Sequence, residues 1–250
     1  MIFRKGKTEL EKMRRANLIV AEVLDHLSRL VKPGVSTKEL DEVAEELIRK
    51  SGGLPSFKGY QGFPASVCAS VNEEVVHGIP RRDKILCEGD ILAVDVGVQF
   101  EGYHGDSART FPVGQISDEL SKLLEVTKES LYEGIREVKV GTRVSDVSAA
   151  IQAHVEAYGF SIVREFVGHG IGKSLHEEPQ VPNYGTPGRG PRLREGMVLA
   201  IEPMVNLGGP GVKVLADNWT AVTIDGQCSA HFEHSVAVTD NGPWILSEPS

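Results

Sequence analysis

The sequence predicts an α+β protein of 250 residues, a single catalytic domain over residues 1–250 made of two pseudo-equivalent halves, about 1–115 and 116–250. Three observations support this prediction. A short apolar run, typical of a buried strand, ends in a carboxylate twice, at Asp95 and at Glu202. A helix pair precedes each copy, and glycines that end helices repeat at the same separation as the two acids. We therefore expect the two acids to occupy equivalent places.

Composition narrows the class of protein. With 40% hydrophobic and 25% charged residues, the chain can bury a large core. A formal net charge of −8 does not favour binding to the phosphate backbone of nucleic acids. Three cysteines without a CxxC pair predict neither a disulfide framework nor a thiolate zinc site. The sequence lacks both an apolar signal peptide and a membrane-length apolar run, so we expect a cytoplasmic protein.

Helical spacing of apolar residues predicts two helices in each half. Thr8 is the expected N-cap of the first helix, and Ser36 or Thr37 of the second. The expected helices cover about residues 8–30, 40–48 and 119–138, with a fourth that ends at Gly159. A helix pair thus opens each half of the chain.

An aromatic loop and a histidine follow the first helix pair. Residues 56–64 interleave glycines with Phe57, Tyr60 and Phe63, which either line a pocket or cap the edge of a core. Alone, His77 would be read as a structural histidine. Its His-Gly-Ile context is repeated at His169, which points to one site beside the duplicated carboxylates.

Two further acids are expected on strands that run back toward Asp95 and Glu202. Asp106 lies about a hairpin's length after Asp95, so the two could face each other across antiparallel strands. His104 shares that face and a turn is an alternative for this segment, but we favour Asp106 as the site residue. In the second half, the counterpart acid is Glu233, in an alternating tract over residues 230–238 that is expected to be one strand.

These acids and one imidazole predict a metal centre. Four bare carboxylates within a few ångströms would raise one another's pKa values, whereas two divalent cations would cancel their charge. Oxygen ligands with one nitrogen suit Co, Mn, Fe or Zn and do not choose among them. Two such ions can share a water, lower its pKa and polarise a carbonyl, which is hydrolytic chemistry. The five candidate ligands are Asp95, Asp106, His169, Glu202 and Glu233.

Several motifs together resemble a known family. The run Gly168–Pro179, the Glu202-Pro-Met motif and the Asn218-Trp-Thr motif look like those of type I methionine aminopeptidases, in their short bacterial form, and the match covers nearly the whole chain. The resemblance implies the pita-bread fold, a central antiparallel sheet covered by two helix pairs. It also implies a metal-dependent aminopeptidase that removes the N-terminal methionine from nascent polypeptides when the second residue is small. We expect a monomer that acts in the cytoplasm without membrane attachment.

The family's functional residues can be carried over by position. The resemblance implies that the four acids and His169 bind two metal ions, that Glu202 also relays protons, and that His77 and His176 hold the scissile peptide and the tetrahedral intermediate. The implied methionine pocket comprises Tyr60, Phe63, Cys68, Leu175 and Trp219, with Phe57 nearby. Phe57, Phe63 and Leu175 depart from the residues common in bacterial members, which puts the shape of the pocket in doubt.

Other readings remain open. X-Pro aminopeptidases and dipeptidases resemble the same core but usually carry an extra N-terminal domain. Metal-free relatives act as binding proteins and would have lost ligands, all of which are present here. Residues 178–194, rich in Pro and Gly with three arginines, are expected to form a surface loop. Its arginines are expected to be solvated or to pair with acids, and contact with a peptide or with the ribosome is the alternative.

Overall fold

A computed structural model describes residues 1–248 of the chain. Its α-helices are α1 (Lys7–Ser28), α2 (Thr37–Lys50), α3 (Asp118–Arg136) and α4 (Val144–Ala157), with a 3₁₀ turn at Tyr60–Gly62. The strands of the first half are β1 (Leu54–Pro55), β2 (Val67–Val71), β3 (Glu74–Val76), β4 (Ile91–Phe100) and β5 (Tyr103–Pro112). Those of the second half are β6 (Ser161–Ile162), β7 (Gly168–Gly170), β8 (Glu177–Val181), β9 (Val198–Ile201), β10 (Met204–Asn206), β11 (Val212–Val214), β12 (Ala221–Thr223), β13 (Ser229–His231), β14 (His234–Thr239) and β15 (Gly242–Ile245).

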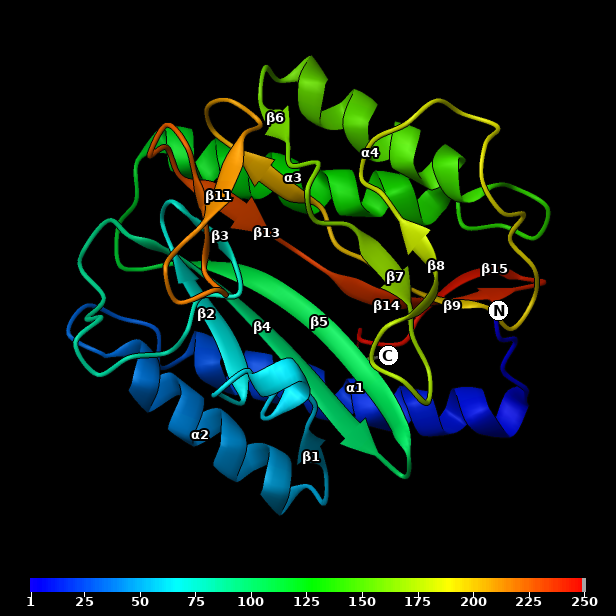
Figure 1. Ribbon diagram of the computed structural model, residues 1–250, viewed down its shortest axis with the longest axis horizontal. Helices are drawn as coiled ribbons and strands as arrows, with labels where there is room; N and C mark the ends of the chain where they lie inside the picture. Colours follow the sequence, from blue (N-terminus) through cyan, green and yellow to red (C-terminus); the bar gives the residue numbers. More distant parts are fainter. Residues whose placement is uncertain (249–250) are drawn as a thin grey trace.

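The strands form antiparallel sheets between the two helix pairs. In Figure 1, α1 and α2 run along the lower edge of the molecule and α3 and α4 along the upper edge, with β4 and β5 crossing the middle. One sheet contains β1, β4 and β2 with β5 on β4, and another has the order β15-β14-β9-β7-β8. Across the two halves, the Glu233 amide donates to the carbonyl of Ala108 at 2.9 Å. The predicted α+β architecture is confirmed.

Each helix pair packs on strands of its own half. Leu24 of α1 and Ile48 of α2 share a buried cluster with Val94 of β4. In the second half, Ile151 of α4 packs with Val236 of β14. Gly134 allows α3 to approach α4, because a Cβ there would lie 2.7 Å from a side-chain carbon of Ile151. A further apolar cluster contains residues from both halves and lies beside the site described below.

The start of α1 differs from the prediction. Its N-cap is Gly6, whose amide donates to the Glu9 carboxylate at 2.9 Å, and Thr8 lies inside the helix. The chain before α1 is bound to the second half of the molecule, since the amide of Lys5 donates to the carbonyl of Gly196 at 2.6 Å. The expected cap at Ser36 is confirmed, because its hydroxyl accepts from the Glu39 amide at 3.2 Å.

The two copies of the strand and carboxylate motif are not identical in structure. Asp95 lies inside β4, which continues to Phe100, whereas β9 ends at Ile201 and Glu202 follows it. The difference has a simple cause, because Glu202 is followed by Pro203, which has no amide hydrogen to donate to a neighbouring strand.

Two other boundaries correct the predictions. The expected single strand over 230–238 is interrupted at Phe232 and Glu233, where the Glu233 amide bonds to Ala108 of β5 in the other half of the chain. The expected loop over 178–194 begins inside β8. Its three arginines are exposed, as the expectation of solvated side chains requires, and Arg192 donates from Nη1 to the backbone carbonyl of Gly141 at 2.8 Å.

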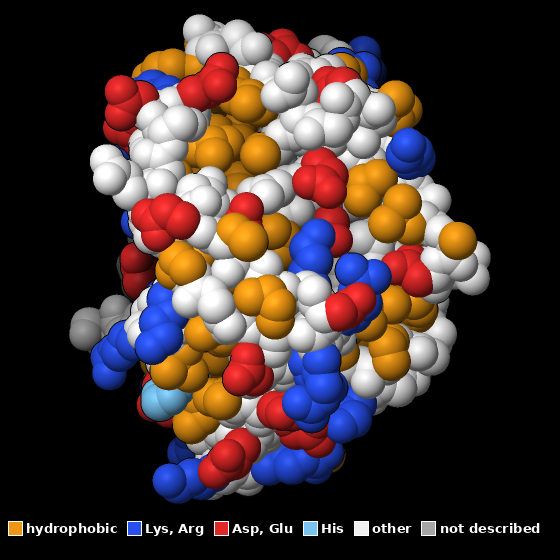
Figure 2. Space-filling model, turned by 90° about the vertical axis from the view of Figure 1, so that its left-hand side faces the viewer, with side chains coloured by type: hydrophobic (Ala, Val, Ile, Leu, Met, Phe, Trp, Pro, Cys, Tyr) orange, Lys and Arg blue, Asp and Glu red, His pale blue; other side chains and the backbone are white. Residues whose placement is uncertain are grey.

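The surface carries mixed charge. On the face shown in Figure 2, Lys and Arg side chains stand among Asp and Glu side chains, with hydrophobic side chains scattered between them. Interspersed charge of this kind does not favour a polyanion such as a nucleic-acid backbone. None of the helices within residues 1–248 is long and apolar enough to cross a lipid bilayer.

Candidate active site

The predicted site residues meet in one cavity between the two halves. The cavity has a volume of about 330 Å³ and is lined by every residue that the sequence analysis proposed for the site. These residues are Phe57, Tyr60, Phe63, Cys68, His77, Asp95, Asp106, His169, Leu175, His176, Glu202, Trp219 and Glu233. His169 lies close to acids of the lining, whereas the aromatic residues share an apolar cluster with Cys68 and Leu175, so the cavity combines a polar group with an apolar one.

The acids reach the cavity from four different segments. β4 and β5 pair so that Asp106 lies opposite Gly97, which places Asp106 and Asp95 diagonally across the two strands. Glu202 and Glu233 both stand at strand ends, after β9 and just before β14. His169, on β7, pairs with Ala200 of β9 and so lies beside the strand that leads to Glu202. Strand pairing places two of the ligands in one sheet and three at strands of another, and the hydrogen bond from the Glu233 amide to the Ala108 carbonyl joins the two sheets at the site.

The distances suit ions held between the side chains. The His169 Nε2 atom lies 4.0 Å from Asp106 Oδ2 and 3.6 Å from Glu202 Oε1. Asp106, His169 and Glu233 each offer a ligand atom within 4.8 Å of the others. These separations exceed a hydrogen bond and are about the spacing of two ligands on one cation.

The cluster also contains unsatisfied buried oxygens. Within residues 1–248, Asp95 Oδ1, Asp106 Oδ1 and Glu233 Oε1 are buried without a hydrogen-bond partner. Burying a carboxylate oxygen without a partner is costly, and a bound cation is the usual compensation. The donor set, carboxylates with one imidazole, is the one that Co, Mn, Fe or Zn ions accept. The residues present therefore fit a divalent metal centre.

Burial and mutual repulsion govern the acids' protonation without ions. Burial raises the pKa of Asp95 to about 7. The pKa values of Asp106, Glu202 and Glu233 are also raised well above their usual range, first by burial and then by the negative charges of the neighbouring acids. The histidines shift the other way, since burial and then the nearby His176 lower the pKa of His169 to about 3. The imidazoles are thus neutral at pH 7, as metal ligation requires.

Two histidines stand at the cavity wall. The ring of His176 packs against the ring of His169 with centroids 4.2 Å apart, and its Nδ1 lies 2.8 Å from the Tyr60 hydroxyl. Burial lowers the pKa of His176 and so favours the neutral ring, in which the tyrosine hydroxyl can donate to Nδ1 while Nε2 carries the hydrogen. His77 has a φ of 59°, in the left-handed region that non-glycine residues rarely adopt outside functional sites.

The aromatic walls surround the apolar end. The ring of Phe63 meets that of Trp219 edge to face, with centroids 5.1 Å apart. Phe57 packs directly on the β4 backbone, because a Cβ on Gly97 would come within 2.6 Å of its ring. Of the two alternatives for the 56–64 loop, the structure agrees with the first, in which its aromatic residues line a pocket. Gln61 also lines the cavity and was not proposed from the sequence.

His231 is a second residue that sequence reasoning missed. It is 2% exposed, its Nε2 lies 3.7 Å from Glu202 Oε2, and that nitrogen is buried without a hydrogen-bond partner among residues 1–248. The His-Phe-Glu-His run shows this histidine two residues before Glu233, and alternation would have placed both side chains on one face. His104, the rival of Asp106, instead lies 2.8 Å from the Ser56 hydroxyl and outside the cavity lining.

These pKa shifts predict how the metal-free protein responds to pH. A carboxyl whose pKa is raised on folding stays protonated while its unfolded counterpart ionises, so stability falls as pH rises. The histidines oppose this below about pH 6.5, where the unfolded chain binds the extra protons. Above about pH 6.5 only the carboxyls remain. We expect the free energy of unfolding of the chelated protein to fall there as pH rises, and Asp95, whose pKa is about 7, should contribute less once the pH passes that value.

Urea unfolding of the chelated protein between pH 6.5 and about 8 measures this slope. The variant Glu233→Gln replaces one buried acid with a neutral amide of the same size, so its slope should be shallower. Protein loaded with divalent ions should show a weaker dependence, because the bound ions replace the protons. A chelated wild type that gains stability over this range would contradict the assigned direction of the shifts.

Comparisons with known proteins agree with this geometry. Residues 11–240 match the model of metallopeptidase family M24. The chain is 59% identical over 247 residues to methionine aminopeptidase 1 of Bacillus subtilis, with 99% of each chain covered. It is also similar to the crystal structure of a methionine aminopeptidase from Thermotoga maritima, with a TM-score of 0.98, 47% identity and both chains fully covered. A prolidase from Pyrococcus horikoshii shares the fold at 22% identity, a TM-score of 0.80 and 64% coverage of that chain. The expected pita-bread fold is confirmed.

Proposed function

The chain belongs to metallopeptidase family M24, and from this membership and the cavity geometry we propose that it removes the N-terminal methionine from nascent polypeptides. The observation that carries the proposal is the meeting of a buried carboxylate and histidine cluster with an apolar end lined by aromatic rings, Leu175 and Cys68. A methionine thioether packs favourably against aromatic edges and sulfur. A methionine side chain seated there would present its own peptide bond to the cluster.

We assign the metal ligands to the clustered acids and His169. Two divalent ions would be held by Asp95, Asp106, His169, Glu202 and Glu233. When bound, the ions supply an activated water and polarise the substrate carbonyl. Glu233 Oε1 and Asp106 Oδ1 are buried without a hydrogen-bond partner. We assign to these two carboxylates the binding of the positively charged ions.

Glu202 is the proposed proton carrier. It stands beyond the end of β9 between His169 and His231, and burial followed by the charges of Asp95 and Asp106 raises its pKa. Positive charge bound at the cluster would oppose this shift and keep the carboxylate ionised, so that it can accept a proton from the attacking water. We assign to Glu202 the transfer of a proton from the attacking water to the leaving amine.

His176 and His77 are proposed to hold the reacting peptide. Because the Tyr60 hydroxyl occupies Nδ1 of His176, its Nε2–H is free to donate to the carbonyl oxygen as negative charge develops there. Burial, followed by the neighbouring His176, lowers the pKa of His77 to about 4, so it also acts as a neutral donor or acceptor to the substrate backbone.

Replacing His176 with alanine should test its role. The loss of one donor to a developing oxyanion costs roughly 3 kcal/mol, or about a hundredfold in kcat. Steady-state kinetics on a Met-Ala-Ser peptide measures the effect, and elemental analysis reports the bound metal. A variant that lost its metal while keeping the rate per bound metal unchanged would show that His176 is a ligand.

The same cavity also bears on which second residue of the substrate is accepted. Ions bound at the cluster, together with His77 and His176, would leave little space beyond the scissile bond, so we propose that a small second residue is preferred. We further propose that the enzyme works as a monomer in the cytoplasm, where nascent N-termini emerge. The arginines of residues 178–194 would be the place for a transient contact with the ribosome.

The experiment that tests the proposed function compares substrates and metals. The chelated protein is assayed on Met-Ala-Ser, Met-Ile-Ser and an Xaa-Pro peptide, with Co, Mn, Fe or Zn ions restored one at a time. We expect release of methionine from Met-Ala-Ser, and little from Met-Ile-Ser. Preferred cleavage of the Xaa-Pro peptide would instead favour the X-Pro peptidases. Absence of cleavage with every metal would favour a binding protein.

A further inference from the structure

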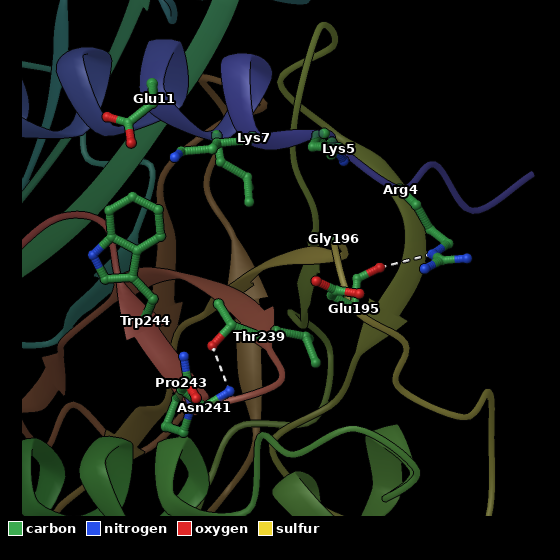
Figure 3. Close-up of a pocket in the computed structure, with 13 residues that line it drawn as sticks. Arg4, Lys5, Lys7, Glu11, Glu195, Gly196, Thr239, Asn241, Pro243 and Trp244 are labelled. Atoms are coloured by element: carbon green, nitrogen blue, oxygen red, sulfur yellow. Dashed lines mark hydrogen bonds between the residues drawn. The ribbon is translucent and has the colours of Figure 1, made fainter.

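The segment before α1 crosses to the second half of the molecule. We call residues 2–6 the N-terminal strap. Figure 3 shows it leaving the start of α1 and passing beside Glu195 and Gly196, along the edge of a surface hollow. The Arg4 Nε donates to the carbonyl of Glu195 at 2.7 Å, and the Lys5 amide donates to that of Gly196 at 2.6 Å. A Cβ on Gly196 would lie 2.5 Å from the Lys5 carbonyl oxygen, so this contact depends on glycine.

One side chain of the strap is buried against an acid. The Lys5 Nζ lies 2.7 Å from Glu177 Oε2, and the two side chains are only 4% and 7% exposed. In every other Lys or Arg ion pair within residues 1–248, the basic side chain is at least 27% exposed. Because desolvation offsets most of the attraction in a buried pair, such a pair is weak evidence for a role in stability alone.

Glu177 closes the segment that carries His176. Its other oxygen, Oε1, accepts from the Ser174 amide at 3.3 Å. Gly172 packs on both partners of the pair, since a Cβ there would lie 2.5 Å from Lys5 Cε and 2.6 Å from Glu177 Oε1. The carbonyl of Gly172 in turn accepts from the His104 amide at 2.8 Å. The pair thus lies in the middle of a tight turn over residues 172–177.

This turn is continuous with two parts of the proposed site. His176 directly precedes Glu177, and Gly172 follows His169 by three residues. The ring of His176 is held on one side by the Tyr60 hydroxyl, while its backbone is next to the buried pair. We propose that Lys5 is a positioning residue, whose pair with Glu177 fixes residues 172–177 so that His176 presents Nε2 to the substrate carbonyl. The inference rests on the proposed function.

The first test is Lys5→Met with Lys7→Met as the matched control, since Lys7 is an exposed lysine at the start of α1. Misplacing a catalytic donor by about an ångström is enough for a large rate loss. On Met-Ala-Ser we expect Lys5→Met to lower kcat about tenfold, with KM and the metal content close to those of Lys7→Met. Unchanged kcat, or a loss confined to KM, would overturn the proposal.

A double-mutant cycle separates positioning from general damage. If Lys5 acts through His176, then Lys5→Met should have little further effect on kcat in a His176→Ala background. An equal loss in both backgrounds would overturn the proposal, because it would show that Lys5 supports the fold and not this histidine. Inactivity of both the wild type and Lys7→Met would instead contradict the proposed function.

A second variant covers the case in which Lys5→Met does not fold. Lys5→Met alone leaves the Glu177 carboxylate buried and unpaired. Combining Lys5→Met with Glu177→Gln removes both charges and keeps an acceptor for the Ser174 amide. We expect this variant to fold, as thermal melting will show, and to retain the tenfold loss in kcat. Wild-type kcat in the folded double variant would overturn the proposal.

Discussion

Replacing Glu202 with glutamine is expected to lower kcat by about a thousandfold while changing KM little. Glutamine has nearly the same size and can still accept hydrogen bonds, but its amide cannot take a proton from water and pass it to an amine. The loss therefore falls on the transition state and not on substrate binding. Steady-state kinetics on Met-Ala-Ser gives both constants, and the effect should greatly exceed that of His176→Ala.

Because Glu202 is also a proposed ligand, this result needs a control for metal loss. Rates are to be expressed per bound metal from elemental analysis, with saturating metal in the assay. A variant with near wild-type kcat per bound metal would show that another group carries the proton. His231, whose Nε2 lies 3.7 Å from Glu202 Oε2, would then be the first candidate, and His231→Gln in the same background would identify it.

The duplication in the sequence explains why much of this site could be predicted. The repeated apolar runs before Asp95 and Glu202 are local patterns, and each indicates a buried strand without knowledge of the other half. The return acids Asp106 and Glu233 follow from hairpin spacing and strand alternation. The structure brings these four acids into one cavity with His169.

What the sequence did not reveal depends on contacts between distant segments. The strand break before Glu233 arises because its amide bonds to Ala108, which belongs to the other half. The N-cap at Gly6 in place of Thr8 likewise follows from a strap whose partners lie near residues 177 and 196. His231 lies two residues before Glu233 in the sequence, but its distance of 3.7 Å from Glu202, which depends on the folded arrangement, is what links it to the site.

The second large effect is expected when metal is removed from the protein. The wild-type protein should bind two divalent ions, lose activity in EDTA and regain it when metal is restored. Glu233→Ala or Asp95→Ala should lose at least one ion, and with it nearly all activity, because each removes a charged ligand from a cluster with buried, unpartnered oxygens. The measurement is metal content by elemental analysis together with kcat. Full activity in EDTA with no bound metal would end the dinuclear proposal.

Stability distinguishes loss of a ligand from damage to the fold. Without metal, the four buried acids repel one another, so removing Glu233 should stabilise the chelated protein. With metal, the same change should destabilise it, because binding to the folded state adds stability that grows with the logarithm of the affinity. Glu74→Ala is the control, since Glu74 is an acid only 12% exposed that lies outside the cavity and pairs with Lys84. Glu74→Ala should keep two ions, and its change in stability relative to wild type should have the same sign with and without metal. A Glu233→Ala protein that is less stable than wild type both with and without metal would show that the acid supports the fold and not the ions.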